Sequence, residues 1–179
     1  LTPELDFALL QIECRRKAAK KLPDTLANQR FVFPTTLSAE QCTSDLLAQF
    51  HSTLVDDGLK LIDLTSGLGI DVFHFAHKAC SITAVELNPV VADALSVNAQ
   101  TLGLDNVSVV NGDCVEYVAN CHEHYDVAFI DPARRGANGQ RLFALSDCDP
   151  DVTAMLPSLR KICRKLIVKA SPMLDVTQT

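Results

Sequence analysis

The chain has 179 residues, 47% of them hydrophobic and 21% charged, so it can bury a core and fits a single domain. Its formal net charge of -6 excludes a generally basic surface, so a nucleic-acid partner has to be held by a local basic patch or by a further domain. The seven cysteines form no Cys-x-x-Cys pair, and no stretch resembles a signal peptide or a bilayer-spanning segment, so we expect a cytoplasmic protein without a membrane partner. Nothing in the sequence indicates the oligomeric state.

Residues 1–55 are predicted to form a helical N-terminal region. Thr2 is typical of an N-cap and Pro3 of a first helical residue, so a helix is expected from there to about Lys21. Its last turns are basic, which we interpret as a solvated helix end suited to the helix dipole, with an RNA-facing patch as the alternative. A second helix is predicted from a capping box that begins at Ser38, and it is expected to continue to about His51.

From residue 56 onward, short apolar runs alternate with helical stretches, which is typical of a mostly parallel sheet with helices on both faces. The predicted strands are residues 60–64, 81–85, 107–111, 127–131 and 166–170. The predicted helices of this region are residues 70–76, 89–102 and 152–163. We therefore predict an α/β, Rossmann-like domain over residues 56–179.

Acidic or glycine-rich signatures stand at the ends of the first four predicted strands. They are Asp63-Leu64-Thr65-Ser66-Gly67-Leu68-Gly69, Glu86-Leu87-Asn88-Pro89, Asn111-Gly112-Asp113-Cys114 and Asp131-Pro132-Ala133-Arg134. An open parallel sheet binds its ligand across the carboxyl ends of its strands, so these segments are expected to line one cleft.

The first signature indicates the type of cofactor. Gly67 and Gly69 remove the Cβ atoms that would block a ligand, and they permit the positive φ angles of a tight turn. The third glycine of a dinucleotide-binding turn is missing, because residue 72 is Val. A carboxylate at Asp63 repels a pyrophosphate but attracts the ammonium and sulfonium groups of S-adenosylmethionine (AdoMet). Together with Thr65 of the same turn, these residues favour AdoMet over a nicotinamide cofactor.

The second and third signatures predict the contacts to the nucleoside. Glu86 can accept hydrogen bonds from both ribose hydroxyls, and Leu87 follows it, whereas Asn88 is interpreted as the N-cap of the next helix. Asp113 can accept from the amino group of adenine, and the backbone beside it at Cys114 can donate to a ring nitrogen. An Asx-turn is the structural alternative for Asp113.

The fourth signature predicts the acceptor site. Asp131 can hold an amino or imino group or help to remove a proton, and Pro132 stiffens the loop. Arg134 and the next residue, Arg135, can clamp a phosphate of RNA, with a structural role as the alternative.

Other constellations of chemically active residues are weaker. Cys121-His122-Glu123-His124 with Cys114 has the right ligand types for zinc, but it lies in a polar connection, so we predict no metal. His74 and His77 are expected to be packed or solvent-facing rather than catalytic.

With these residues assembled, residues 59–172 resemble a class I AdoMet-dependent methyltransferase. The RNA methyltransferases are the most similar, because Asp131 to Gly136 matches the Asp-Pro-Ala-Arg-x-Gly element with which the uracil-C5 enzymes position their base. Those enzymes carry a nucleophilic cysteine after the fifth strand, where this chain has Ala170. Without a thiolate, carbon 5 of uracil is a poor nucleophile, so the resemblance implies a nitrogen or oxygen acceptor. The chain also resembles a group of bacterial proteins in which a methyltransferase-like domain precedes a THUMP-like RNA-binding domain. The resemblance includes Ser171 to Asp175, after the fifth strand.

The class I sheet has seven strands, whereas five are predicted here. We therefore expect the chain to be a fragment of a longer protein and the domain to be incomplete at its C-terminus, with an open edge at the fifth strand. The alternative is that a segment not assigned as a strand completes the sheet.

Taken together, the signatures predict AdoMet-dependent methyl transfer, with RNA as the substrate. The alternative from another class is a catalytically silent AdoMet-binding module that supports an RNA-binding partner domain, and a nicotinamide-dependent oxidoreductase ranks third.

Overall fold

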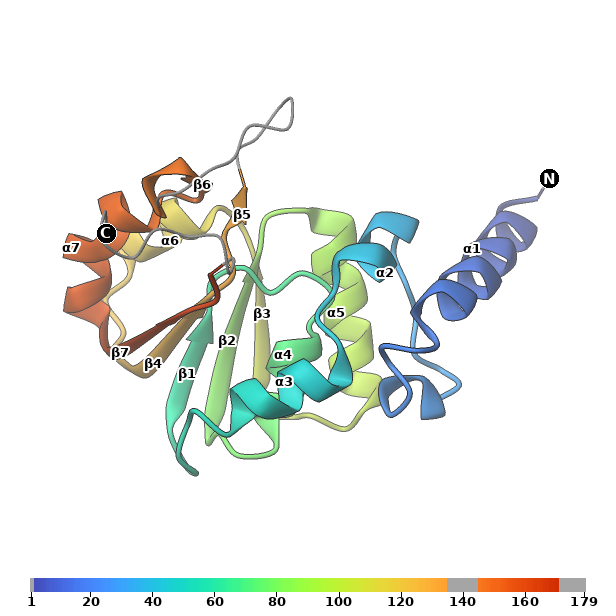
Figure 1. Cartoon of the computed structure of the whole chain (residues 1–179), viewed down its shortest axis with the longest axis horizontal. Coiled ribbons are helices and arrows are strands. Elements are labelled where there is room, and N and C mark those ends of the chain that lie inside the picture. The colour runs from blue at the N-terminus through green and yellow to red at the C-terminus, as the bar shows by residue number, and fades with distance from the viewer. Residues whose placement is uncertain (1, 135–144, 171–179) are drawn as a thin grey trace.

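A five-stranded parallel sheet forms the centre of the protein (Figure 1). The computed structural model describes residues 2–134 and 145–170. The strands lie in the order β3-β2-β1-β4-β7, and their bounds are Lys60–Asp63 (β1), Ser81–Glu86 (β2), Val107–Asn111 (β3), Tyr125–Ile130 (β4) and Cys163–Val168 (β7). The five predicted strands are confirmed, although β4 and β7 begin earlier than predicted because Tyr125 pairs with Cys163. The strand order reverses between β1 and β4, where an open α/β sheet places its ligand.

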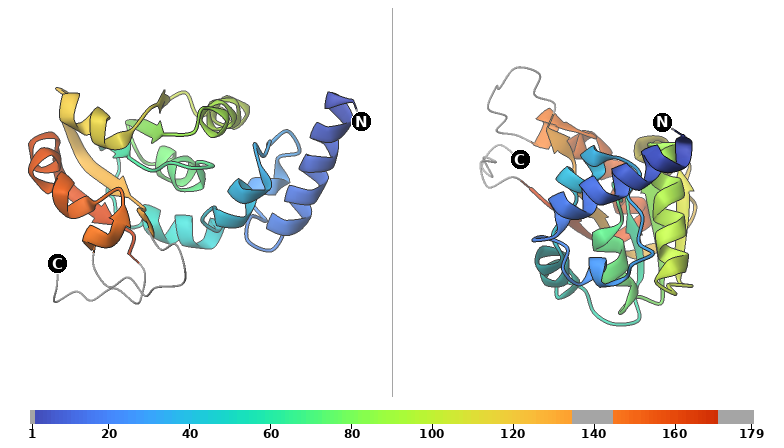
Figure 2. Two further views of the ribbon diagram at one scale, coloured as in Figure 1. Left: turned by 90° about the horizontal axis from the view of Figure 1, so that it is seen from above. Right: turned by 90° about the vertical axis from the view of Figure 1, so that its right-hand side faces the viewer.

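Helices cover both faces of the sheet (Figure 2). Their bounds are Ile70–Ala76 (α4), Pro89–Thr101 (α5), Cys114–Asn120 (α6) and Val152–Ile162 (α7). Side chains alternate across each strand, so Leu61 packs with the core on the side of α4 and α5, whereas Ile62 packs with the core beside α6 and α7. The predicted Rossmann-like fold is thereby confirmed. Helix α6 was not predicted, since we interpreted the segment after the third strand as a turn and a polar connection.

The N-terminal region consists of short helices that precede β1. Their bounds are Pro3–Ala18 (α1), Thr25–Ala27 (η1, a 3-10 turn), Thr36–Gln41 (α2) and Asp45–Ser52 (α3). Thr2 caps α1 as predicted, with its side chain accepting from the Leu5 amide. The prediction of one helix from Ser38 to His51 is wrong. Thr35 caps α2 through the amide of Ser38, and Ser44 caps α3 through the amide of Leu47, so two caps divide the segment into two helices.

This region shares a core with the sheet, although α1 extends away from it in Figure 1. Phe31 and Phe33 are buried, and the ring of Phe31 packs edge-on against Phe73 of α4. The fully buried Asn98 of α5 accepts from the amide of Val32 at 2.9 Å and donates to its carbonyl at 2.8 Å. The Asn98 side-chain amide thus satisfies both backbone groups of Val32, as a neighbouring strand would.

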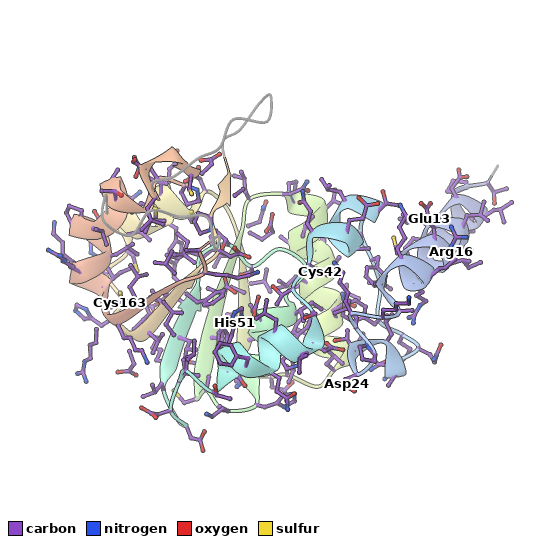
Figure 3. The ribbon with its side chains drawn as sticks, viewed as in Figure 1. Glu13, Arg16, Asp24, Cys42, His51 and Cys163 are labelled. Atoms are coloured by element: carbon purple, nitrogen blue, oxygen red, sulfur yellow. The ribbon has the colours of Figure 1, made fainter. Side chains whose placement is uncertain are left out.

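The basic end of α1 is occupied largely by local contacts. Arg15 donates to the carbonyl oxygens of Gln29 and Phe31, at 2.9 and 2.7 Å. Lys17 pairs with Glu13 and Glu40, whose carboxylates lie 3.0 and 2.7 Å away. These contacts favour a structural role for the cluster over an RNA-facing patch; Figure 3 labels Glu13 and Arg16 on this helix.

Outside the main sheet, a short turn and two strand segments lie near the fourth signature. Their bounds are Ala133–Arg134 (β5), Leu145–Asp147 (η2) and Cys148–Asp149 (β6), and β5 pairs with β6 in antiparallel fashion. None of the helices in residues 2–134 and 145–170 is long and apolar enough to cross a membrane. All seven cysteines lie in the described residues and none forms a disulfide; Cys42 and Cys163 are labelled in Figure 3.

Candidate active site

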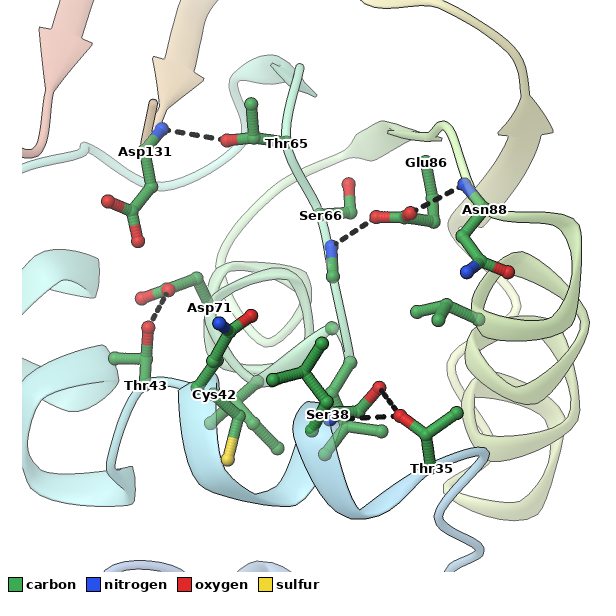
Figure 4. A pocket seen from close by; sticks show the side chains of 17 residues that line it. Thr35, Ser38, Cys42, Thr43, Thr65, Ser66, Asp71, Glu86, Asn88 and Asp131 are labelled. Carbon is green, nitrogen blue, oxygen red and sulfur yellow. Dashed lines mark hydrogen bonds between the residues drawn. The ribbon is translucent and has the colours of Figure 1, made fainter. Parts of the chain in front are cut away.

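Two adjoining cavities, each about 390 Å³, open at the carboxyl ends of β1, β2 and β4. Both are lined by Thr65, Gly67, Glu86 and Asp131, so they form one cleft where the sheet reverses its strand order. The first cavity extends between the glycine turn and α2 (Figure 4). The second extends past Asp113 toward the start of α6. The cleft therefore brings together residues from all four predicted signatures.

The glycine turn after β1 shapes the first cavity. Both predicted glycines have a positive φ, 52° at Gly67 and 89° at Gly69. A Cβ atom on Gly67 would meet no heavy atom within 4 Å, so this position leaves room beside the cleft. A Cβ atom on Gly69 would lie 2.8 Å from both Leu95 and Phe73. The packing of α4 and α5 therefore requires glycine at position 69, although Gly69 also lines the first cavity, whereas a Cβ atom at Gly67 would meet no neighbour in the described chain.

Asp63 lies beneath the cleft rather than on its surface. Its side chain is buried at 1% exposure and is not part of the lining of either cavity. One oxygen accepts from the Thr65 amide at 2.9 Å, whereas Oδ2 has no hydrogen-bond partner in the described part of the chain. Burial raises the pKa of the Asp63 carboxyl well above its usual range, and the nearby carboxylates of Asp71, Asp131 and Glu86 add to that rise.

Glu86 is held at the end of β2 by backbone groups (Figure 4). Oε2 accepts from the Gly67 amide at 2.9 Å, and Oε1 accepts from the Asn88 amide at 2.8 Å. Each carboxylate oxygen can accept a second hydrogen bond, so both remain able to bind a diol. Leu87 lines the second cavity and is 68% exposed, which leaves its side chain open to an apolar ligand face. Asn88 caps α5 through the Val90 amide, as predicted.

Asp113 and Cys114 begin α6 and line the second cavity. Oδ1 of Asp113 accepts from the amides of Val115 and Glu116, at 2.7 and 3.2 Å, which is the local capping role considered as the alternative. The Cys114 amide is not one of the groups that this carboxylate caps. Burial raises the pKa of the Cys114 thiol to about 11, so the thiol stays protonated near neutral pH.

Asp131 follows β4 and lines both cavities. Its amide donates to Thr65 Oγ1 at 2.7 Å, which joins the ends of β4 and β1 (Figure 4). Thr65 therefore supports the predicted acceptor residue as well as lining the cofactor cleft. Pro132 is half-buried and is not among the lining residues of either cavity. The side chain of Arg134, together with Arg135 and Gly136, lies outside the residues that the structure describes.

The N-terminal region forms a wall of the cleft that the sequence did not predict. Its lining residues in the first cavity are Thr35, Leu37, Ser38, Gln41, Cys42 and Thr43. Gln41 lines the second cavity as well, so α2 ends where the two cavities meet. Ala133 of the fourth signature also lines the second cavity, together with Asp149 and Pro150, which were not predicted. No local motif marks the unpredicted positions, because they reach the cleft only through the folding of distant segments.

Apart from Cys114, the residues of the weaker constellations do not line the cleft. No group of three or more His, Cys, Asp or Glu residues in residues 2–134 and 145–170 is arranged to hold a metal ion. The Nδ1 atom of His74 lies 2.9 Å from the Ile70 carbonyl oxygen, and His77 is exposed, as expected for non-catalytic histidines.

Comparison with known sequences identifies the family. Residues 59–168, which contain the whole described sheet, match the family described as RNA cap guanine-N2 methyltransferase. The ribosomal RNA small subunit methyltransferase J of Aeromonas hydrophila subsp. hydrophila is 29% identical over 130 residues, covering 63% of this chain and 52% of that protein. The chain spans about half or less of the length of the curated relatives it matches.

Solved structures agree with this assignment. A candidate methyltransferase from Porphyromonas gingivalis W83 has a TM-score of 0.87 and 32% identity, covering 98% of this chain and 43% of that chain. A candidate methyltransferase from Streptococcus mutans, in complex with SAH, has a TM-score of 0.50 and covers 67% of this chain and 65% of that chain; at 16% identity it shows the fold alone. The chain therefore belongs to the RNA cap guanine-N2 methyltransferase family, and the predicted class I methyltransferase fold and AdoMet cofactor are confirmed.

Proposed function

We propose that the full-length protein transfers the methyl group of AdoMet to a nitrogen or oxygen atom of RNA. The observation that carries this proposal is the charge of the cleft. Asp71, Glu86 and Asp131 line the first cavity, Asp113 and Asp149 are added in the second, and no Lys or Arg occurs among the described lining residues of either. Such a lining attracts a sulfonium and an ammonium group and repels a pyrophosphate.

The residues of the chain divide the cofactor between the two cavities. Gly67 leaves space for the methionine part beside the N-terminal wall, and Asp63 lies buried beneath the cleft, where its ionised form would attract the ammonium group. Glu86 accepts from the ribose hydroxyls with the lone pairs that its backbone contacts leave open. Leu87, Asp113 and Cys114 surround the adenine in the second cavity.

The acceptor is presented by Asp131 and Pro132, with Arg134 as a phosphate contact. The sulfonium of AdoMet is already a good leaving group, so the contribution of these residues is alignment of the acceptor and removal of its proton. Support for RNA comes from the family description and from the rRNA relative named above. RNA would be held by a further domain or by a local basic patch.

A nitrogen or oxygen acceptor is favoured over carbon 5 of uracil by the cysteines of the cleft. Covalent activation of uracil needs a thiolate. Cys42 and Cys114 line the two cavities, and burial raises the pKa of both thiols. The family description makes the exocyclic amino group of guanine the first acceptor to test.

Calorimetry on the full-length protein tests the cofactor part of this proposal. We expect AdoMet and its demethylated product to bind, and NADH not to bind, because the carboxylates of the cleft repel its pyrophosphate. NADH binding without AdoMet binding would instead support the oxidoreductase alternative. A folded protein that binds AdoMet but transfers no methyl group to RNA would support the silent module.

A further inference from the structure

Lys169 forms an ion pair with Asp131, which lines the cleft. It follows β7 directly, and its amide donates to the Ile130 carbonyl oxygen at 2.9 Å. Since Ile130 pairs with Val168 in the sheet, the next residues along the two strands, Asp131 and Lys169, lie side by side. The parallel register therefore fixes both backbones at the place predicted for the acceptor.

The ammonium group of Lys169 has two polar partners. Nζ lies 2.5 Å from Asp131 Oδ2 and 3.1 Å from Thr43 Oγ1. The Lys169 and Asp131 side chains are 25% and 37% exposed, and Thr43 is buried. Thr43 belongs to the connection between α2 and α3, so one contact of Lys169 comes from the sheet and the other from the N-terminal region.

The Thr43 hydroxyl is itself oriented by buried groups. It donates its only hydrogen to Asp71 Oδ2 at 2.6 Å, as Figure 4 shows, so its oxygen has lone pairs left to accept from Lys169. The other oxygen of Asp71 lies 2.7 Å from Nδ1 of the buried His51. Thr43 is therefore a fixed acceptor rather than a freely rotating hydroxyl.

Asp131 is restrained at both its backbone and its side chain. Thr65 accepts from its amide at 2.7 Å, and Lys169 binds Oδ2. Within residues 2–134 and 145–170, the other carboxylate oxygen, Oδ1, has no hydrogen-bond partner. Since Asp131 lines both cavities, this oxygen is the one that an acceptor group can use.

We propose that Lys169 is a positioning residue for methyl transfer: it holds Asp131 by one carboxylate oxygen, so that the other oxygen is aimed at the acceptor. Thr43 fixes the ammonium group in turn, and this makes the N-terminal region part of the catalytic machinery. The proposal rests on the proposed role of Asp131 in presenting the acceptor. Because alignment is the main source of rate in this transfer, loss of the restraint acts on turnover rather than on cofactor binding.

The test compares Lys169→Met with Lys169→Arg in the full-length protein. Transfer of tritium from labelled AdoMet to total bacterial RNA gives kcat, and calorimetry gives the AdoMet affinity. We expect Lys169→Met to lower kcat by about 100-fold with the AdoMet affinity within about twofold of wild type, because a small misplacement of an aligned group has an effect of that order. Lys169→Arg keeps the cation beside Asp131 and is expected to recover much of the loss.

Lys165→Met is the matched control. It removes a lysine of the same strand whose Nζ donates to the Leu54 carbonyl at 2.6 Å, outside the lining of both cavities. Its kcat should equal that of wild type. Thr43→Val removes the second partner of Lys169 and should lower kcat by about tenfold, and Thr43→Ser, which keeps the hydroxyl, should recover most of that loss.

The outcomes separate this proposal from the proposed function. Unchanged turnover in Lys169→Met, or no recovery in Lys169→Arg, would overturn the positioning role while leaving methyl transfer intact. If wild type binds AdoMet but transfers nothing to RNA, the proposed function fails, and crystal structures of wild type and Lys169→Met then decide on Lys169. If the Asp131 carboxylate changes its orientation in Lys169→Met, the proposal is supported. If the carboxylate keeps its wild-type orientation, the proposal is overturned.

Discussion

The two sides of the cleft are held together in different ways. On the cofactor side, Glu86 is bound by the amides of Gly67 and Asn88, so neighbouring turns position the group. On the acceptor side, Asp131 depends on Thr65, Lys169 and, through Lys169, on Thr43. The cofactor side is built from backbone groups of local turns, whereas the acceptor side is built from side chains that are distant in the sequence. Substitutions should therefore affect the two sides separately.

Asp131→Ala is expected to give the largest difference between the effect on methyl transfer and the effect on AdoMet binding. Removing the carboxylate should lower the rate of methyl transfer to RNA by about 100- to 1,000-fold, because alignment and proton removal are both lost. The AdoMet affinity should change little, because Lys169 already offsets the charge of Asp131 and the other carboxylates of the cleft remain. Kinetics and calorimetry on the same preparation measure both, with Asp93→Ala on the exposed surface of α5 as the control. A large loss of AdoMet affinity in Asp131→Ala would contradict the division.

The paired variants Gly69→Ala and Gly67→Ala test the glycine turn. At Gly69 the new Cβ atom would clash with Leu95 and Phe73 at a φ of 89°, so we expect a loss of about 3 kcal/mol in the free energy of unfolding. At Gly67 there is no clash, and the backbone strain alone corresponds to about 1–2 kcal/mol. Denaturant unfolding measures both. Gly69→Ala should lower the stability more than Gly67→Ala, whereas Gly67→Ala should weaken AdoMet binding more than Gly69→Ala.

Glu86→Gln should weaken AdoMet binding by about 1–2 kcal/mol, because an amide offers one acceptor oxygen where the carboxylate offers two. Transfer at saturating AdoMet should remain near wild type, since Asp131 and Lys169 are untouched. Titration calorimetry measures the affinity, and Glu116→Gln on the exposed face of α6 is the control. Equal AdoMet affinity in Glu86→Gln and wild type would contradict the proposed contact between Glu86 and the ribose.

Asp63→Asn should cause the smallest of these effects, a change in thermal stability that depends on pH. Burial raises the pKa of Asp63, so the folded state binds its proton more tightly than the unfolded chain. The stability associated with that proton is present below the unfolded pKa of about 4 and is lost as the pH rises through the raised pKa of the folded state. Asp63→Asn should therefore melt at a higher temperature than wild type near neutral pH, with a smaller difference in acid.

The same variant separates stability from binding. AdoMet affinity should fall in Asp63→Asn, because the carboxylate that attracts the ammonium group is gone. In wild type, the affinity should increase as the pH rises through the raised pKa of Asp63. A pH-independent difference in melting temperature would show that the Asp63 carboxyl does not take up a proton on folding.

The cofactor side of the cleft was more predictable from the sequence than the acceptor side. The five strands and Glu86 were predictable, because hydrophobic runs and the residues that end them are local patterns. The capping box at Ser38 was misassigned, because Thr35 caps α2 and Ser44 caps α3, so two caps divide the segment that was predicted as one helix. Gly69 was predicted to lie beside the ligand, and it does line the first cavity, but its packing against Leu95 of a distant helix was not predictable.

Lys169 was not predicted for the same reason. The motifs beside it, Ala170 and Ser171 to Asp175, say nothing of a contact with Asp131. Its role comes from the pairing of β4 with β7 and from the fold of the N-terminal region. Contacts between distant segments are set by tertiary packing, which a single sequence does not display. The acceptor side is therefore where the structure adds most.

The central claim is tested most directly by transfer of a tritium-labelled methyl group from AdoMet to RNA by the full-length protein. We expect incorporation by wild type that is lost in Asp131→Ala while calorimetry shows unchanged AdoMet binding. Equal incorporation by Asp131→Ala, or no incorporation by a folded wild-type protein that binds AdoMet, would contradict the account.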